Sequence, residues 1–331
     1  MKARLKDIAK YLLFLGIGGL FLWLAFRKTE WAKLVEDFRS ADYSYVIYSM
    51  LMGYAAFISR GLRWNLLLEP LGKKAKPWNA IHAVSIGYFA NVAVPRAGEL
   101  MRCTSLKSTD DIPLERLFGT VVLERVIDAA ILLALILFTF IIQLGNLQHF
   151  FDQAFANSDG SAAQGPDIKL ILLGAIVVFG LLAYLFRRKI QALPIFIKVR
   201  ELWQGFKEGF KSLSKVKNKW AFYGHTAFIW IMYFLMIYVV IFALPATSEI
   251  SLANGLFVMI AGGMGMVVPA PGGIGSYHYL VMLALGVLGI NETDGLSFAT
   301  LVHSGQLVMT LIAGVLALPM IYRARAILKK Q

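Results

Sequence analysis

Three ionisable residues inside an apolar run are the first candidates for chemistry. Glu124, Arg125 and Asp128 lie well within residues 116–143, which are otherwise predominantly apolar. If this run crosses a bilayer, each charge near its centre costs about 2.5–3.5 kcal/mol, so the side chains must face protein or water. Glu124 and Asp128 are four residues apart and share one helix face. We favour the charged wall of a substrate cavity; the alternative is an internal ion-pair cluster that only locks helices together.

A second group follows a proline that interrupts another apolar run. Arg96, Glu99 and Arg102 come directly after Val94-Pro95. The planar fork of arginine donates two hydrogen bonds to two phosphate oxygens, and a helix that starts after Pro95 would add its positive dipole end. We therefore predict contacts to an anionic group. For Arg102, anchoring at the cytoplasmic surface is an equally good interpretation.

A second interruption and two histidines complete the candidate site. Residues 269–273 read Pro-Ala-Pro-Gly-Gly. Backbone groups at Pro269, Gly272 and Gly273 could bind a ligand, which is tolerated in a membrane only beside a cavity or within protein. A tight turn that needs glycine at positive φ is the other interpretation, and the two are compatible. His278 and His303 are lone histidines in apolar segments, and packing is the commoner role of such residues.

The elements that must position these residues are membrane helices. Of the 331 residues, 58% are hydrophobic and 16% are charged, whereas a soluble domain has roughly 45–50% apolar and about 25% charged residues. The apolar residues form runs near helix-spanning length, and alternating ten-residue segments are absent, which favours helices over a barrel. We expect about seven or eight inserted segments in an all-α, polytopic bundle, from runs at 8–26, 43–68, 79–94, 116–143, 168–186, 220–244, 251–268, 274–290 and 297–322.

The distribution of basic residues predicts the orientation. Residues 144–168, 244–256 and 288–297 contain no Lys or Arg, whereas residues 187–219 contain ten. Lys and Arg remain cytoplasmic, so we place both termini in the cytoplasm and the chain in the cell inner membrane. Residues 27–42 carry four basic residues on the opposite side, and the spacing of the apolar residues Trp31, Leu34, Val35 and Phe38 suggests a surface helix there. Arg60 and Arg63 end the run 43–68, and we expect them to reach the lipid headgroups.

This orientation predicts two inverted halves. The pair 251–268 and 274–290 must enter and leave on one side, and 79–94 is too short to span the bilayer. Both breaks read Val-Pro-x-x-Gly, at 94–98 and 268–272. Paired broken segments in inverted halves point to a transporter binding site. We divide one membrane domain, residues 1–331, into an N-terminal helix and surface segment (1–42), a first repeat (43–145), a linker with a basic loop (146–219) and an inverted second repeat (220–322), each repeat with a re-entrant or broken hairpin.

Several classes of function are disfavoured. The net charge of +13 follows from basic loops that meet anionic lipid, so we expect no nucleic-acid partner. The chain has one cysteine, which excludes an internal disulfide and a cysteine-rich metal site. Glycines at 262–265 lie in a membrane segment and are not a nucleotide motif. We therefore predict neither a metal nor another cofactor.

Four motifs resemble a known family. They are Arg60-Gly61-Leu62-Arg63-Trp64, Val94-Pro95-Arg96-Ala97-Gly98-Glu99, Glu124-Arg125-x-x-Asp128 and Pro269-Ala270-Pro271-Gly272-Gly273-Ile274-Gly275. Over about residues 10–325, the chain is similar to the flippase-like membrane domain of lysylphosphatidylglycerol synthases. The resemblance implies movement of phospholipid, or of another anionic or modified lipid, between leaflets. In those two-part synthases a soluble aminoacyl-transferase domain follows, so a chain that stops at Gln331 is expected to resemble the translocating half only.

Three hypotheses follow, and we favour the first. The first is a lipid flippase without enzyme activity, whose partners are membrane lipids. The second is a membrane-embedded transferase for lipid-linked substrates with Glu124 or Asp128 as its base. The third is a non-transporting membrane protein that recruits a soluble lipid-modifying enzyme through residues 187–219.

Overall fold

A computed structural model of the chain describes residues 2–94, 97–155 and 216–328, and these residues form helices and short connections only. The all-α prediction is thereby confirmed for them. The α-helices are α1 (Lys2–Phe26), α2 (Trp31–Ser40), α3 (Tyr43–Leu68), α4 (Pro77–Ala93), α5 (Gly98–Asp110), α6 (Leu114–Phe155), α10 (Lys219–Tyr238), α11 (Leu252–Val267), α12 (Ser276–Val287) and α13 (Glu292–Leu328). Four 3₁₀ helices are η1 (Glu69–Leu71), η2 (Val239–Ala243), η3 (Pro245–Thr247) and η4 (Pro271–Gly273).

Length and hydropathy identify several of these helices as candidate membrane spans. Among the described residues, three segments are long and apolar enough: Leu114–Gly145, Lys219–Ala243 and Glu292–Leu328. A fourth span is possible if Leu12–Phe26 and Trp31–Ser40, which are bent by 91°, count as one. The larger number of inserted segments, which includes the short and broken ones, stays a prediction.

The chain divides into two compact units. One contains residues 1–124 and 213–331, and the other contains residues 125–212. Of the second unit, the structure describes residues 125–155, which continue α6. Arg125 and Asp128 thus belong to the second unit, and Glu124 is the last residue of the first segment of the first unit.

Side chains at the starts of three helices fix where those helices begin. Asp42 precedes α3 and accepts a hydrogen bond from the Ser44 backbone N–H at 2.9 Å. The Ser44 hydroxyl and N–H also hold the pKa of Asp42 below its ordinary value. Asn218 caps α10 and Ser251 caps α11 in the same way. Such caps satisfy backbone donors that the first helical turn leaves without partners.

The first helical hairpin is α4 and α5, which pack against each other. A methyl group on Gly98 would lie 2.2 Å from the Gly87 carbonyl oxygen, so the two helices touch backbone to backbone. Asn91 Oδ1 accepts a hydrogen bond from the Gly98 N–H at 2.7 Å. Glycine and the asparagine amide together hold the hairpin closed.

The second hairpin is α11 and α12. A Cβ on Gly265 would lie 2.7 Å from Tyr277 Cα, and the Ser276 hydroxyl donates to the Gly265 carbonyl at 2.8 Å. Gly262 faces the Tyr277 ring, so the glycines at 262–265 pack α11 against α12. In the turn, Gly272, Gly273 and Gly275 have φ values of 58°, 74° and 87°, which confirms the predicted glycine-dependent turn.

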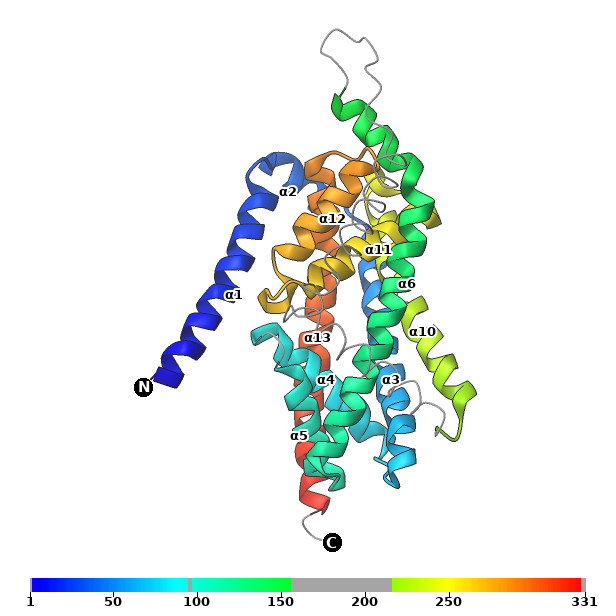
Figure 1. Ribbon diagram of the computed structural model, residues 1–331. Coiled ribbons are helices and arrows are strands. Elements are labelled where there is room, and N and C mark those ends of the chain that lie inside the picture. The colour runs from blue at the N-terminus through cyan, green and yellow to red at the C-terminus, as the bar shows by residue number, and fades with distance from the viewer. Residues whose placement is uncertain (1, 95–96, 156–215, 329–331) are drawn as a thin grey trace, which may run out of the picture. The chain divides into compact units, whose positions relative to one another are not determined.

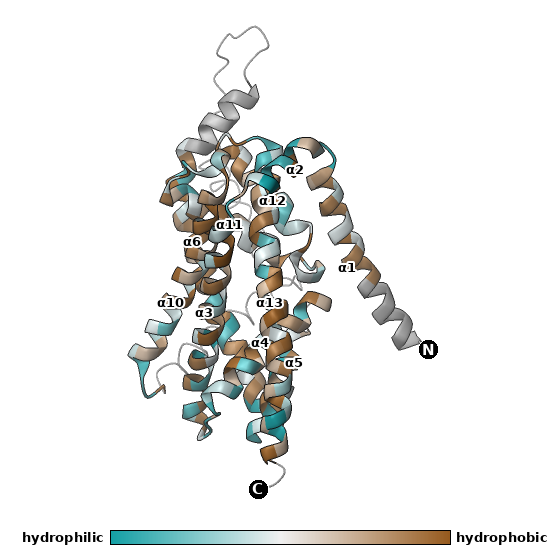
Figure 2. Ribbon diagram, turned by 180° about the vertical axis from the view of Figure 1, so that it is seen from behind, coloured by the Kyte–Doolittle hydropathy of each residue, from teal (hydrophilic) through white to brown (hydrophobic). Residues whose placement is uncertain are grey.

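The turns of the two hairpins meet. The α4–α5 hairpin and the α11–α12 hairpin approach from opposite ends of the helical bundle (Figure 1), and a Cβ on Gly272 would lie 3.7 Å from Val92 Cα. Helix α1 packs on the second turn: a methyl group on Gly275 would lie 2.3 Å from the Gly18 carbonyl oxygen. Hydrophobic residues dominate α11, whereas hydrophilic residues gather at the end of the bundle where α3 and α5 finish (Figure 2). The two breaks predicted from sequence therefore lie together.

Candidate functional site

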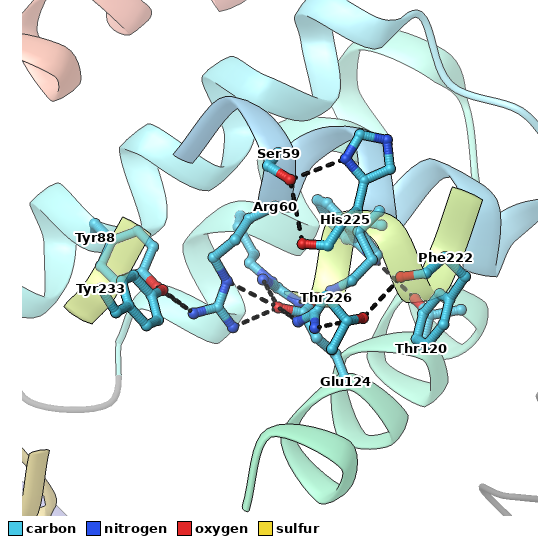
Figure 3. Close-up of polar contacts among 12 residues, drawn as sticks. Ser59, Arg60, Tyr88, Thr120, Glu124, Phe222, His225, Thr226 and Tyr233 are labelled. Carbon is cyan, nitrogen blue, oxygen red and sulfur yellow. Dashed lines mark hydrogen bonds and ion pairs between the residues drawn. The ribbon is translucent and has the colours of Figure 1, made fainter. Parts of the chain in front are cut away.

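A buried carboxylate surrounded by guanidinium groups lies inside the first unit (Figure 3). Glu124 is fully buried, and its Oε1 accepts from Arg60 Nη2 at 2.6 Å. Arg102 Nη2 donates to Oε2 at 2.8 Å, and Arg63 Nη2 lies 3.4 Å from Oε1. The three arginine residues are 0–3% exposed. Each is therefore held in the interior by a charge-assisted contact to one shared anion.

Helix geometry explains how these residues converge. Arg60 and Arg63 are three residues apart on α3, so they lie on one face of that helix. Arg102 is on α5, which the first hairpin returns towards α3. Its Cζ lies 4.5 Å from the centroid of the Trp64 ring, a cation–π contact, and Trp64 Nε1 donates to Thr120 Oγ1 at 2.8 Å. The Trp64 side chain thus links Arg102 to the first turns of α6.

Hydroxyl groups complete the surroundings of the arginine residues. Arg60 Nη1 donates to the Tyr88 and Tyr233 hydroxyls, at 2.5 and 2.6 Å. These two hydroxyl oxygens are 3.1 Å apart. Arg63 Nη1 donates to Thr226 Oγ1 at 3.4 Å. Helices α3, α4, α5, α6 and α10 therefore all contribute to one polar cluster, which we call the arginine cluster: Arg60, Arg63, Tyr88, Arg102, Glu124, Thr226 and Tyr233.

The prediction that Arg60 and Arg63 reach the headgroups is wrong. Both are buried, because Glu124 and neighbouring hydroxyl groups satisfy them inside the protein. The surface-anchor interpretation of Arg102 is also wrong, since that residue is 3% exposed. Sequence reasoning missed Tyr88 and Tyr233 as members of the cluster. The burial of Arg60 and Arg63 could have been predicted, because they are three residues apart on one face of an apolar helix. Buried arginine residues need an anion such as Glu124 nearby.

The remaining charged candidates are distributed differently. Glu99 is half-buried near the start of α5, and Arg96 lies outside the described residues. The Arg125 side chain is exposed and that of Asp128 is half-buried, both in the second unit. Glu124 of this motif is a member of the arginine cluster, and the roles of Arg96, Glu99, Arg125 and Asp128 stay predictions.

The two histidines that look isolated in the sequence lie together at the second turn. Their ring centroids are 4.8 Å apart. His303 Nε2 lies 2.9 Å from the Gly272 carbonyl oxygen, which can only accept, so Nε2 carries a proton. His278 Nδ1 accepts from the Gly275 N–H at 3.3 Å. The pair therefore fastens the turn that contains Gly272 and Gly273, with half-buried Pro269 just before it.

The arginine cluster is suited to an anion and not to a metal ion. In the part of the chain that the structure describes, no three His, Cys, Asp or Glu side chains come together as potential ligands. The donors around Glu124 are arginine residues, which repel a cation. Guanidinium and hydroxyl groups instead suit an anion with several oxygen acceptors.

Comparison with known proteins identifies the family of the chain. The family model described as the lysylphosphatidylglycerol synthase TM region matches residues 10–314. The chain belongs to this family. It is accordingly a membrane protein, as predicted, and the arginine cluster, the histidine pair and both hairpins lie within the lysylphosphatidylglycerol synthase transmembrane region.

Curated relatives extend this assignment. The UPF0104 membrane protein MJ1595 of Methanocaldococcus jannaschii is 30% identical over 134 residues, which are 40% of each chain. The glycosyltransferase AglD of Haloferax volcanii is 23% identical over 311 residues, 86% of this chain and 50% of the relative. The chain thus matches half or less of the length of these relatives. No solved structure matches it.

Proposed function

We propose that this member of the lysylphosphatidylglycerol synthase transmembrane-region family moves a phospholipid, or another anionic or modified lipid, between membrane leaflets. The observation that carries the proposal is the arginine cluster, in which Arg60, Arg63 and Arg102 converge on the carboxylate of Glu124. A phosphodiester presents the same kind of acceptor oxygens as a carboxylate. Without lipid, the guanidinium groups bind Glu124; when lipid is bound, its phosphate could take over some of these contacts. The exchange of one anion for another leaves no buried cation without a counter-charge.

The hairpins support the same proposal. Broken helices in corresponding positions of inverted halves mark the binding sites of many transporters. The contact between Val92 and Gly272 brings the two breaks together. We propose that the hairpins are re-entrant and that the two repeats are inverted. The polar headgroup would then pass beside the two helix interruptions near the middle of the membrane.

The orientation is part of the proposal. Basic residues follow α3 at Lys73, Lys74 and Lys76, and others end α13 at Arg323 and Arg325. We propose that this end faces the cytoplasm, that both termini lie there, and that the protein resides in the cell inner membrane. Exposed Trp78 and Trp220, at the starts of α4 and α10, would then lie at the headgroup level.

The test is leaflet exchange of labelled lipids in proteoliposomes with zwitterionic, anionic or aminoacylated headgroups. We expect exchange of one headgroup class, lost in Arg102→Gln and retained in Arg325→Gln, which changes an exposed arginine. Arg96→Ala and Arg125→Ala test the two predicted site residues outside the cluster. Wild-type exchange by folded Arg102→Gln protein would reject the cluster as the lipid site.

A second function is favoured by one comparison. AglD is named a glycosyltransferase and covers 86% of this chain. The chain could instead act as a membrane-embedded lipid transferase, or as a partner that recruits a soluble lipid-modifying enzyme through residues 187–219. Product formation by the purified protein would favour the transferase. Loss of a co-purifying enzyme on deletion of that loop, without any lipid exchange, would favour the partner.

A further inference from the structure

A groove of about 500 Å³ lies between α3 and α10, outside the arginine cluster. Its walls are mainly apolar and include Ile58 and Leu62 of α3 and Phe228 of α10. Sites for small ligands have volumes of roughly 300–1,000 Å³. The groove is therefore large enough for a flexible chain and is too apolar for a headgroup alone.

Two polar side chains are among those that line the groove. Ser59 Oγ and His225 Nδ1 are 2.9 Å apart and join α3 to α10. The next residue of α3 is Arg60 and the next residue of α10 is Thr226, both members of the arginine cluster (Figure 3). The groove and the cluster are thus both built on the α3–α10 seam, and the Ser59–His225 contact lies one residue from the cluster on each helix.

The surroundings of the groove indicate its occupant. Helix α10 is part of the candidate span Lys219–Ala243, and Phe228 and Ile231 are 41% and 52% exposed. In a bilayer these side chains meet hydrocarbon. A groove without an occupant would leave its apolar lining without dispersion contacts, and a flexible hydrocarbon chain can supply them.

We propose that the α3–α10 groove binds one acyl chain of a membrane phospholipid and holds that lipid beside the seam that leads to the arginine cluster. The inference rests on the proposed lipid translocation, and it specifies a lateral binding site for the lipid tail. It assigns Ser59 and His225 to the boundary between the tail and the polar headgroup. Gly224 keeps the groove open, since no atom lies within 4 Å of a Cβ built there.

The test is photo-labelling in vesicles of phosphatidylcholine and phosphatidylglycerol, with a diazirine in the acyl chain of the phosphatidylglycerol. We expect adducts on residues 55–62 and 221–228 of the wild-type protein, mapped by mass spectrometry. Gly224→Leu fills the groove and should weaken binding of the acyl chain by about tenfold or more. The yield of these adducts should fall by the same factor. Gly286→Leu is the matched control, because a Cβ at Gly286 of α12 also meets no atom within 4 Å.

The outcomes separate this inference from the proposed function. Adducts outside both segments, or equal labelling of Gly224→Leu and wild type, would overturn the acyl-chain site even if leaflet exchange is normal. Groove-specific labelling without leaflet exchange by the wild-type protein would keep the lipid site and reject translocation. The wild-type adduct map is decisive by itself if Gly224→Leu fails to fold.

Discussion

Arg102 and Glu124 are 22 residues apart in the chain, and a 2.8 Å ion pair joins their side chains where both are almost completely removed from solvent. The pair connects α5, the second helix of the first hairpin, to α6. Arg60 and Arg63 of α3 share the same carboxylate. Glu124 of α6 therefore joins α3 and α5 to its own helix. Its substitution should disturb more contacts than that of any one arginine of the cluster.

Glu124→Gln should strongly destabilise the protein. Removing one partner from a buried ion pair costs about 3–5 kcal/mol, because the remaining charge stays in the interior. We expect a loss of that size in the free energy of unfolding, measured by denaturant titration in detergent micelles. Glu69→Gln is the control, since Glu69 lies 3.8 Å from exposed Lys74 and such a pair contributes about 0–1 kcal/mol. Equal losses in the two variants would contradict the anchoring role.

Tyr88→Phe and Tyr233→Phe should have coupled effects. Both hydroxyls accept from Arg60 Nη1 and contact each other. Nη1 carries two N–H donors, and the contact between the two hydroxyls couples them: removal of one hydroxyl also takes away a hydrogen-bond partner of the other, so the losses in the single variants should not add up to the loss in the double variant. We expect a coupling energy of about 0.5–3 kcal/mol in a double-mutant cycle of unfolding free energies. Additive losses would mean that the two hydroxyls act independently.

Gly98→Ala should separate the first hairpin. Its new methyl group would lie 2.2 Å from the Gly87 carbonyl oxygen, so α5 must move away from α4. Overpacking of this kind costs about 1–3 kcal/mol, and leaflet exchange should fall because Arg102 is on the displaced helix. Gly119→Ala on α6 is the matched control, with no atom within 4 Å of its Cβ. That variant should be neutral, or more stable by up to about 1 kcal/mol through helix propensity.

His303→Phe should loosen the second turn, because the Gly272 carbonyl loses its hydrogen-bond donor. His303→Gln carries an amide donor and should retain more of the bond. We expect faster backbone hydrogen exchange at residues 270–276 in the phenylalanine variant, with a smaller change in the glutamine variant. If the two variants exchange at the same rate, the histidine contributes packing and not a hydrogen bond.

The sequence predicts the helices and their breaks better than it predicts the partners of the charged residues. Apolar runs and Val-Pro-x-x-Gly sites fix where helices start and reverse, since both are local properties. The pairing of Arg60 with Glu124 depends on a tertiary contact between α3 and α6, so the position of Arg60 near a helix end suggested lipid headgroups instead. The histidine pair was missed for the same reason: His278 and His303 lie on different helices, and only the turn at Gly272 brings their rings together.

The close approach of Gly18 and Gly275 has a mechanical consequence. No methyl group fits between these two backbones, so a displacement of the α11–α12 turn must either carry α1 along or break this contact. Helix α1 continues through the 91° bend into α2. Lys28 in the bend and Lys33 in α2 form ion pairs with Glu292 and Asp294 at the start of α13. When the turn moves, α1 should therefore pivot about the bend at residues 27–30. A spectroscopic label near the N-terminus of α1 would then move further than the turn itself.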